Sequence, residues 1–160
     1  MPLLTIISNK NFSSIEKQEI MKVATDFVIE EWNVLPDKIQ VHISTVGDDE
    51  VSRGGVSPIN SQFGILSRRI SIKSDDYYAS PSLISDVEKL VMISIDTWTG
   101  LSLVSKTNLV NKLTQYFMTK HKISGDNTVI YIREIIPENW FQNSISGRNP
   151  DFLNKSREVK

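Results

Sequence analysis

The sequence contains no cysteine and only two histidines, His42 and His121. Without cysteine the chain forms no disulfide, offers no thiolate to a metal and has no thiol nucleophile. Two histidines are too few for a histidine-rich metal site, so we expect neither a metal nor a cofactor. A chain without disulfides suits a reducing compartment, which favours a cytoplasmic location.

The sequence also lacks an excess of either charge, because 18 Lys+Arg face 19 Asp+Glu and leave a net charge of -1. We therefore expect no nucleic acid or anionic membrane as a partner. Its apolar runs, such as 129–132, are far shorter than the ~20 residues that span a bilayer, and the first twenty residues do not resemble a signal peptide. With 39% apolar and 23% charged residues, the composition is that of a globular domain.

An internal repeat appears when the chain is aligned with itself at a shift of 89 residues. The apolar positions agree without a gap over about forty residues; for example, Leu4 and Ile6 align with Ile93 and Ile95. We therefore interpret 1–160 as a single domain. Its parts are a first unit at 1–46, a connector at 47–89, a second unit at 90–136 and a tail at 137–160.

Each unit has the pattern of a strand, a helix and a second strand. In the first unit Ser13 and Glu16 form a capping-box pattern, and apolar residues follow at spacings of three and four until Pro36. Residues 39–43 then alternate as in a half-buried strand. The expected elements are strands at 3–8, 39–43, 90–96 and 128–134 and helices at 13–35 and 105–122.

Such units normally form right-handed parallel βαβ structures. Two of them predict an α+β fold, with a four-stranded sheet and both helices on one face. The other face would be a large apolar patch, which we expect a second subunit to cover. In the connector, the spacing of the apolar residues at 62–72 predicts a strand, and residues 82–89 are predicted to form a helical turn. In the tail, Trp140, Phe141 and Phe152 are the expected anchors.

Several segments together resemble the tautomerase superfamily, most of all its two-unit malonate semialdehyde decarboxylase group. They are Met1-Pro2-Leu3-Leu4-Thr5-Ile6, the helix that follows Ser13, and Pro137-Glu138-Asn139-Trp140. The resemblance implies a βαβ fold, a homotrimer and a catalytic Pro2 that is exposed when Met1 is removed. It also implies a catalytic aspartate at Asp37, within Asp37-Lys38-Ile39-Gln40, and an apolar pocket wall at Trp140 and Phe141.

The chemistry of Pro2 supports this role independently. A terminal proline is a secondary amine, terminal amines titrate near pH ~8, and burial lowers that value. A neutral amine can move a proton between the carbon and the oxygen of an enol. The residue aligned with Pro2 is Val91, within the chain, so one active centre per chain is expected. Asp37 has two interpretations, as a group that orients water and as a turn residue after Pro36.

The sequence departs from the family at its carboxylate-binding arginines. Their positions hold Phe12, Gln40 and Leu101, which argues against an acidic substrate. The candidate cations that could replace these arginines are Lys10, Arg133, Arg68 and Arg69. An alternative interpretation of Arg68 and Arg69 is ordinary solvated surface charge. Strand alternation would also place these two side chains on opposite faces. Trp98 is a further candidate for the pocket wall, although such aromatics also serve in simple packing.

The expected function is cofactor-independent tautomerisation, or a related decarboxylation, of a small carbonyl or enol compound. Two alternatives remain. One is a non-catalytic trimeric binding member of the same fold. The other is a cofactor-free dehalogenase or hydratase that holds its substrate with Arg68 or Arg69.

Overall fold

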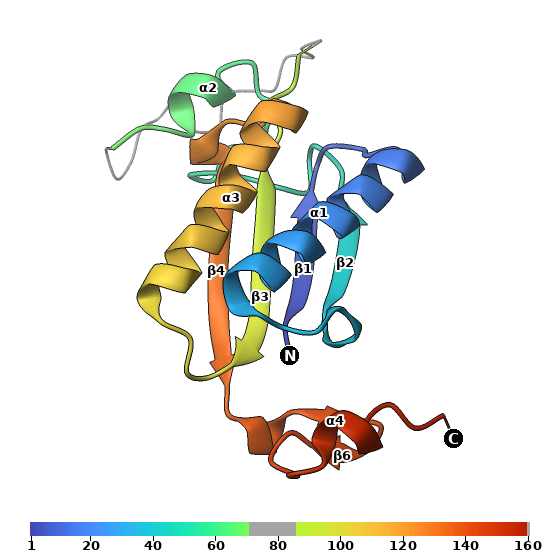
Figure 1. Cartoon of the computed structure of the whole chain (residues 1–160). Helices are drawn as coiled ribbons and strands as arrows, with labels where there is room; N and C mark the ends of the chain where they lie inside the picture. The colour runs from blue at the N-terminus through green and yellow to red at the C-terminus, as the bar shows by residue number, and fades with distance from the viewer. Residues whose placement is uncertain (71–85, 160) are drawn as a thin grey trace.

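The computed structural model, which describes residues 1–70 and 86–159, contains a four-stranded sheet in the order β2-β1-β3-β4 (Figure 1). Each unit contributes a parallel pair, and β1 and β3 run antiparallel at the centre. The start of β1 therefore lies at the opposite end of the sheet from the start of β3. The strands are β1 (Leu3–Ser8), β2 (Gln40–Thr45), β3 (Val91–Trp98) and β4 (Thr128–Ile135).

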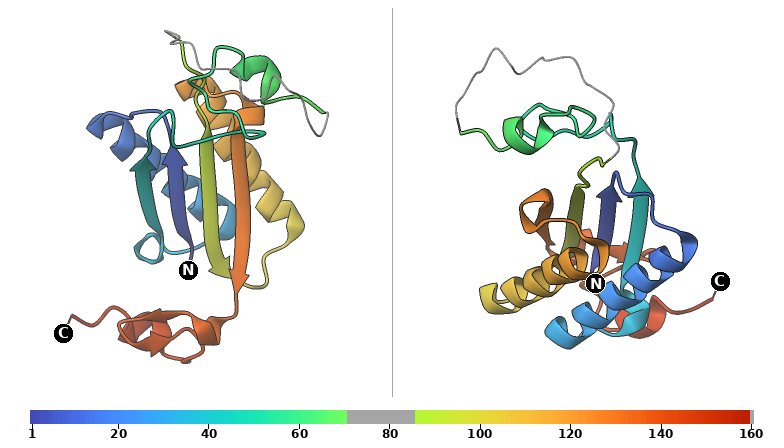
Figure 2. Two further views of the ribbon diagram at one scale, coloured as in Figure 1. Left: turned by 180° about the vertical axis from the view of Figure 1, so that it is seen from behind. Right: turned by 90° about the horizontal axis from the view of Figure 1, so that it is seen from above.

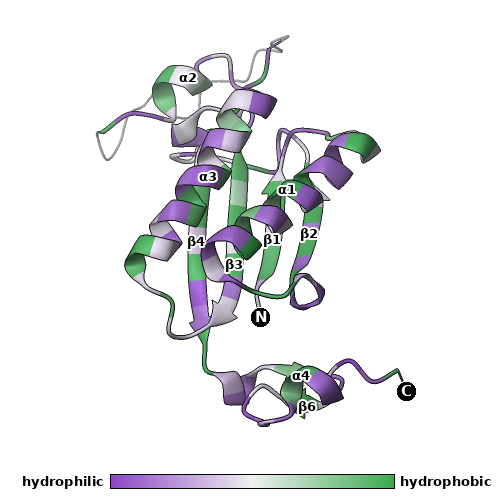
Figure 3. Ribbon diagram, in the orientation of Figure 1, coloured by the Kyte–Doolittle hydropathy of each residue, from purple (hydrophilic) through white to green (hydrophobic). Residues whose placement is uncertain are grey.

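Helices α1 (Ser14–Trp32) and α3 (Leu103–His121) both cover the same face of the sheet, as the sequence predicts (Figures 1 and 2). Their apolar stripes meet the alternate residues of the central strands, and the hydrophobic colouring of β1 and β3 in Figure 3 follows this contact. The shared core includes Leu4, Ile6, Val91, Ile93 and Ile95 from the sheet, Ile20, Ala24, Val28 and Trp32 from α1, and Leu109, Leu113 and Phe117 from α3.

The capping box predicted at Ser13 is present. The Ser13 side chain accepts a hydrogen bond from the Glu16 amide (3.2 Å), and the Glu16 carboxylate accepts one from the Ser13 amide (2.8 Å). Both helices end in a left-handed residue, Asn33 in α1 and Lys122 in α3, which are 89 positions apart. The second helix begins two residues earlier than predicted, because Ser102 is its N-cap.

The repeat continues beyond the forty residues that the sequence shows, through the connector and the tail. Helical turn α2 (Phe63–Leu66) lies 89 residues before α4 (Phe152–Lys155). The isolated bridge between Arg53 and Val56 lies 89 residues before the Gln142–Ile145 pair of strands β5 (Phe141–Gln142) and β6 (Ile145–Ser146). Each unit thus ends in a short arm, at 47–70 in the first unit and 136–159 in the second.

The strand predicted at 62–72 is wrong, because this segment contains α2. Phe63 and Leu66 are its buried residues and lie three positions apart, which is a helical spacing. Of the helical turn predicted at 82–89, residues 86–89 form no helix and 82–85 lie outside the described residues.

Each arm docks on the turn of the other unit. Arg157 in the second arm binds Asp37 of the first unit, with Nε 2.8 Å from Oδ2. Arg68 in the first arm binds Asp126 of the second unit, with Nε 2.7 Å from Oδ2. The tail therefore lies across the end of the sheet at which β1 begins, while α2 lies beyond the other end (Figure 1).

The face of the sheet without helices, which Figure 2 (left) shows from behind, is less apolar than predicted. Met92, Val129 and Tyr131 are exposed on it, but strand alternation also places polar side chains there. Asp96 pairs with Arg133 on this face. The polar residues of the four strands on this face are Thr5, Gln40, His42, Ser44, Ser94, Asp96 and Arg133. Within the described part of the chain, no helix is long and apolar enough to cross a membrane.

Candidate functional site at the amino terminus

Pro2 lies in a cavity of about 230 Å³ between the first unit and the tail. Four of the residues predicted for the site come together here, namely Pro2, Asp37, Trp140 and Phe141. Short 3-10 helices at Pro36–Lys38 and Pro137–Asn139 present the side chains from the two sides. The remaining lining residues are Met1, Leu3, Lys38, Gln40 and Gln142.

The backbone holds Pro2 in place at the beginning of β1. Its carbonyl accepts a hydrogen bond from the Gln40 amide (3.1 Å), which extends the parallel ladder by one residue beyond Leu3. The ring of Pro2 is buried. A proline suits this position because the ladder uses its carbonyl and requires no N–H from it.

Lys38 is a site residue that the sequence argument overlooked. Its side chain is only 3% exposed, and its ammonium group donates to Ser156 Oγ (2.7 Å) and Gln142 Oε1 (3.3 Å). It also lies 3.4 Å from Asp37 Oδ2 and 5.5 Å from the centre of the Phe152 ring. A buried cation next to Pro2 is therefore held by the tail.

Asp37 is an ionised carboxylate at neutral pH. Arg157 donates two hydrogen bonds to it (2.8 and 3.0 Å), and this contact, with a smaller contribution from Lys38, lowers its pKa from 3.8 to about 2. A carboxylate with so low a pKa accepts hydrogen bonds and does not carry a proton near neutral pH. Asp37 therefore fits the role of a group that orients a neighbouring molecule. Its ionised state excludes the role of a general acid.

We expect the contact between the tail and the first unit to weaken in acid. The pKa of Asp37 is lower in the folded state than its ordinary value, so its contribution to folding is present above pH about 4 and is lost as the pH falls toward 2. Tryptophan fluorescence between pH 5 and 2 measures this change, because Trp140 lies in the tail and Trp98 packs against Phe152 of the tail. The Arg157→Gln variant should lack that part of the transition, and identical curves for both proteins would contradict the prediction.

The position of the terminal amine favours its neutral form. With Met1 present, burial, followed by the charge of Lys38, lowers the pKa of the amine from 8.0 to about 6. Burial removes water that would solvate the ammonium ion, and the nearby cation repels it. A terminal amine in this environment is mostly unprotonated at pH 7.

Trp98 lines a neighbouring cavity and not the one around Pro2. This second cavity has a volume of about 250 Å³, and its wall includes the Trp98 and Phe152 rings, whose centres lie 5.5 Å apart. It shares Met1 and Lys38 with the first cavity. Its other lining residues are Asn33, Val34, Leu35 and Leu153.

The packing of the tail on Trp98 requires a glycine at position 147. A Cβ atom there would lie 2.5 Å from Trp98 Cζ2 and 2.7 Å from the Pro137 carbonyl oxygen. We expect Gly147→Ala to lower the free energy of unfolding by about 1–3 kcal/mol, because rigid neighbours must move. Urea denaturation measures the effect. Gly125→Ala is the matched control, since its contact is the flexible Met118 side chain, and equal effects would contradict the prediction.

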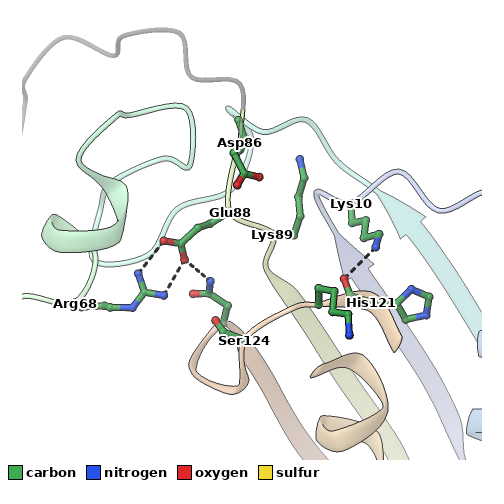
Figure 4. Close-up of a pocket in the computed structure, with 10 residues that line it drawn as sticks. Lys10, Arg68, Asp86, Glu88, Lys89, His121 and Ser124 are labelled. Atoms are coloured by element: carbon green, nitrogen blue, oxygen red, sulfur yellow. Dashed lines mark hydrogen bonds and ion pairs between the residues drawn. The ribbon is translucent and has the colours of Figure 1, made fainter. Parts of the chain in front are cut away.

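The structure does not bring Arg68 to Pro2. Arg68 follows α2 and pairs with Glu88 (2.8 Å) and Asp126 (2.7 Å) beside a cavity of about 480 Å³ at the opposite end of the sheet (Figure 4). The six residues of β1 separate the two ends by roughly 20 Å. Lys10 lines the same distant cavity and donates to the His121 carbonyl (3.0 Å).

The other two candidate arginines also lie outside the Pro2 cavity. Arg69 donates to the carbonyls of Leu66 and Gly54, so the alternation of Arg68 and Arg69 on a strand is wrong. Arg133 makes a two-point contact with Asp96 (2.6 and 2.8 Å) on the face of the sheet without helices. Within one chain the only described cation that lines the Pro2 cavity is Lys38. Among the described residues no cluster of three potential metal ligands occurs.

Two fused βαβ units, each with an arm that docks on the other unit, describe the fold of this chain, and solved structures share it. The native fused 4-OT has this fold, with 14% identity, a TM-score of 0.69 and coverage of 92% of this chain and 98% of that one. Pt0534 inactivated by 2-oxo-3-pentynoate follows with 12% identity, a TM-score of 0.67 and coverage of 91% and 96%. FG41 malonate semialdehyde decarboxylase inhibited by 3-bromopropiolate has 12% identity, a TM-score of 0.60 and coverage of 99% of both chains.

The chain therefore has the fold of the tautomerase superfamily, which confirms the fold that the resemblance implies. Similar structures of fused 4-OT are described as symmetric and asymmetric trimers. No protein-family model matches the sequence, and no curated protein matches it either.

Proposed function

We propose that the protein is a cofactor-independent enzyme in which Pro2, freed by removal of Met1, transfers a proton during keto–enol tautomerisation of a small carbonyl compound. The observation that carries this proposal is the environment of the terminal amine. With Met1 in place, burial and then Lys38 lower the pKa of the Met1 amine to about 6, and the same burial and the same cation would act on the Pro2 nitrogen once Met1 is removed. A base that is neutral at working pH is the group that such a reaction needs.

The proposed reaction needs no other co-reactant. The neutral amine takes a proton from the enol oxygen, and the resulting ammonium returns a proton to the carbon, so the atoms and the charge of the compound are unchanged. Asp37 stays ionised and orients the polar end of the substrate or a water molecule. Trp140 and Phe141 line the cavity from the tail, and Phe141 remains 63% exposed. Decarboxylation is a related reaction of the same enol intermediate, because loss of carbon dioxide also leaves an enolate that must be protonated.

A non-catalytic binding member of the same fold is the second candidate, and the family arginine positions favour it. Phe12 is 2% exposed and packs against His121 with ring centres 5.0 Å apart, so it has a structural role. Gln40 lines the Pro2 cavity but carries no charge. A retained Met1 would favour this candidate, because it removes the secondary amine. We also propose self-association through the face without helices, as the trimeric structures of similar proteins suggest.

Covalent labelling with 2-oxo-3-pentynoate tests the role of Pro2. A neutral secondary amine adds to the alkyne carbon, and its proton moves to the adjacent carbon, so the chain gains the full mass of the reagent. We expect intact-mass analysis to show a chain without Met1 and one added reagent, which peptide mapping places on Pro2. Retention of Met1 or labelling at lysines only would overturn the proposal.

A further inference from the structure

The internal repeat also duplicates the Pro2 cavity at the other end of the sheet. A second cavity, also of about 230 Å³, lies at the start of β3, beside the first arm. All but one of its lining residues lie 89 positions from a residue that lines the Pro2 cavity, and the exception is Ile7 of β1. The second unit therefore keeps a cavity without keeping the proline. Its lining residues are Ile7, Val51, Ser52, Leu90, Val91, Met92, Asn127 and Val129.

The wall of the second cavity has lost the chemistry of the first. Val91, Asn127 and Val129 take the places of the proline, the buried lysine and the glutamine. Val91 lies within the chain and has no free amine. Among the described residues, no ionisable side chain lines this cavity. It therefore differs from the Pro2 cavity in carrying neither a base nor a charge.

The charged groups nearest to this wall compensate one another. Asn127 is 3% exposed, donates to Glu88 Oε2 (2.8 Å) and accepts a hydrogen bond from Arg53 (2.9 Å). Arg53 and Arg68 both pair with Asp126, and Figure 4 shows the further pairing of Arg68 with Glu88. Two cations thus face two carboxylates. Because an ion in the second cavity would lose water without gaining a partner, the cavity favours a neutral molecule.

The apolar part of the wall is open to a ligand. Met92 and Val129 are 40% and 56% exposed, so a molecule that covers them removes apolar surface from water. The Ser52 hydroxyl is exposed and makes no hydrogen bond to another described residue, so it is available to one polar group. An apolar cavity of ~150 Å³ already holds a benzene ring. The second cavity has room for such a ring with a short polar substituent.

We propose that the cavity at the start of β3 is a second binding site, which takes small neutral ring compounds that carry one hydroxyl or carbonyl group. The ring lies against Met92 and Val129, and the polar group meets Ser52. This site shares no lining residue with the Pro2 cavity, so it requires neither a free proline nor the removal of Met1.

Methionine methyl groups are the probes that test this site. Met92 lines the cavity, whereas Met21 and Met118 lie on α1 and α3 and serve as internal controls. In NMR spectra of methyl-labelled protein, benzyl alcohol should shift the Met92 signal saturably and leave the two controls unchanged. Benzoate has the same ring with a negative charge and should bind at least about tenfold more weakly.

Two results of this titration would overturn the proposal. One is equal binding of benzyl alcohol and benzoate at Met92. The other is a Met92 signal that depends on protein concentration and not on the alcohol, which would show that a second copy of the chain fills the cavity.

Val129→Gln tests the apolar wall, because it installs the residue found at the equivalent position of the first cavity. We expect it to weaken benzyl alcohol binding at least about fourfold, which corresponds to one buried CH₂ group. Val104→Gln is the matched control, since Val104 is 70% exposed at the start of α3 and lies outside the cavity. Equal effects of the two substitutions would contradict the proposal.

Val51→Trp tests the volume of the cavity. It installs the residue found at position 140 of the second arm, and its ring should fill the space and abolish the Met92 shift. A folded Val51→Trp protein that binds benzyl alcohol as tightly as the parent would refute the site.

The outcomes separate this proposal from the proposed function. Val129→Gln should leave covalent labelling at Pro2 unchanged, and Pro2→Ala should leave the Met92 titration unchanged. Labelling at Pro2 without benzyl alcohol binding at Met92 refutes the second site and leaves the proline mechanism intact. Binding at Met92 without labelling at Pro2 supports the second site and counts against the proline mechanism alone.

Discussion

Replacing Pro2 with alanine is expected to lower kcat/KM for tautomerisation by about 10²-fold or more, which is the usual contribution of a positioned general base. The variant still begins with an amine once Met1 is removed, but that amine is primary and lacks the proline ring. We expect Met1 to be removed from the variant as proposed for the parent, because alanine is also small. The measurement is the rate of ketonisation of a phenylpyruvate-type enol by proteins whose masses confirm the loss of Met1.

Val91→Ala is the matched control for this variant. Val91 occupies the position of Pro2 in the second unit, is 1% exposed and carries no free amine. Its loss of two methyl groups should lower stability while the folded protein keeps its activity. If Pro2→Ala, correctly processed, remained as active as the parent, the proline mechanism would be wrong.

Removing the Phe152 ring is expected to damage both stability and the site, whereas removing the equivalent Phe63 ring should damage stability alone. Both rings are buried, at 3% and 2% exposure, and each anchors an arm. Truncation of a buried phenylalanine to alanine costs about 3–5 kcal/mol. Phe152 also contacts the Trp98 ring and lies 5.5 Å from Lys38 Nζ, so its loss releases the cation beside Pro2.

Urea denaturation and kcat/KM of the folded variants measure these two effects separately. We expect Phe152→Ala to lower kcat/KM more than tenfold and Phe63→Ala to change it less than twofold. The comparison controls for general destabilisation, since the two residues occupy equivalent positions 89 residues apart. Equal losses of activity in both variants would show that the tail does not build the site.

The sequence predicts the βαβ units well because the signals for them are local. The capping box at Ser13 uses side chains three residues apart, and the apolar periods of α1 and β1 arise from near neighbours. No local signal predicts that one cavity brings together Pro2, Asp37, Trp140 and Phe141. Only the resemblance to a family predicted it. Their proposed roles stay predictions until the variants are measured.

A signal for the longer repeat was present in the sequence and was overlooked. Asn60, Phe63, Ser67 and Arg68 have identical residues 89 positions later, in an order of Asn-x-x-Phe-x-x-x-Ser-Arg. Phenylalanine is the only apolar residue of this motif, so apolar periodicity does not detect it. Once the arms are recognised as equivalent, the pairing of Arg157 with Asp37 follows from that of Arg68 with Asp126.

The sequence by itself determined the secondary structure of the two units and the single terminal proline, because these depend on residues close together in the chain. Only the tertiary structure decided which cations lie near that proline. Lys38 meets Ser156 across 118 positions, and Asp37 meets Arg157 across 120. Such contacts depend on an arm that crosses to the other unit, and no local pattern records where an arm docks. The same crossing placed Arg68 at the far end of the sheet and left Lys38 beside Pro2.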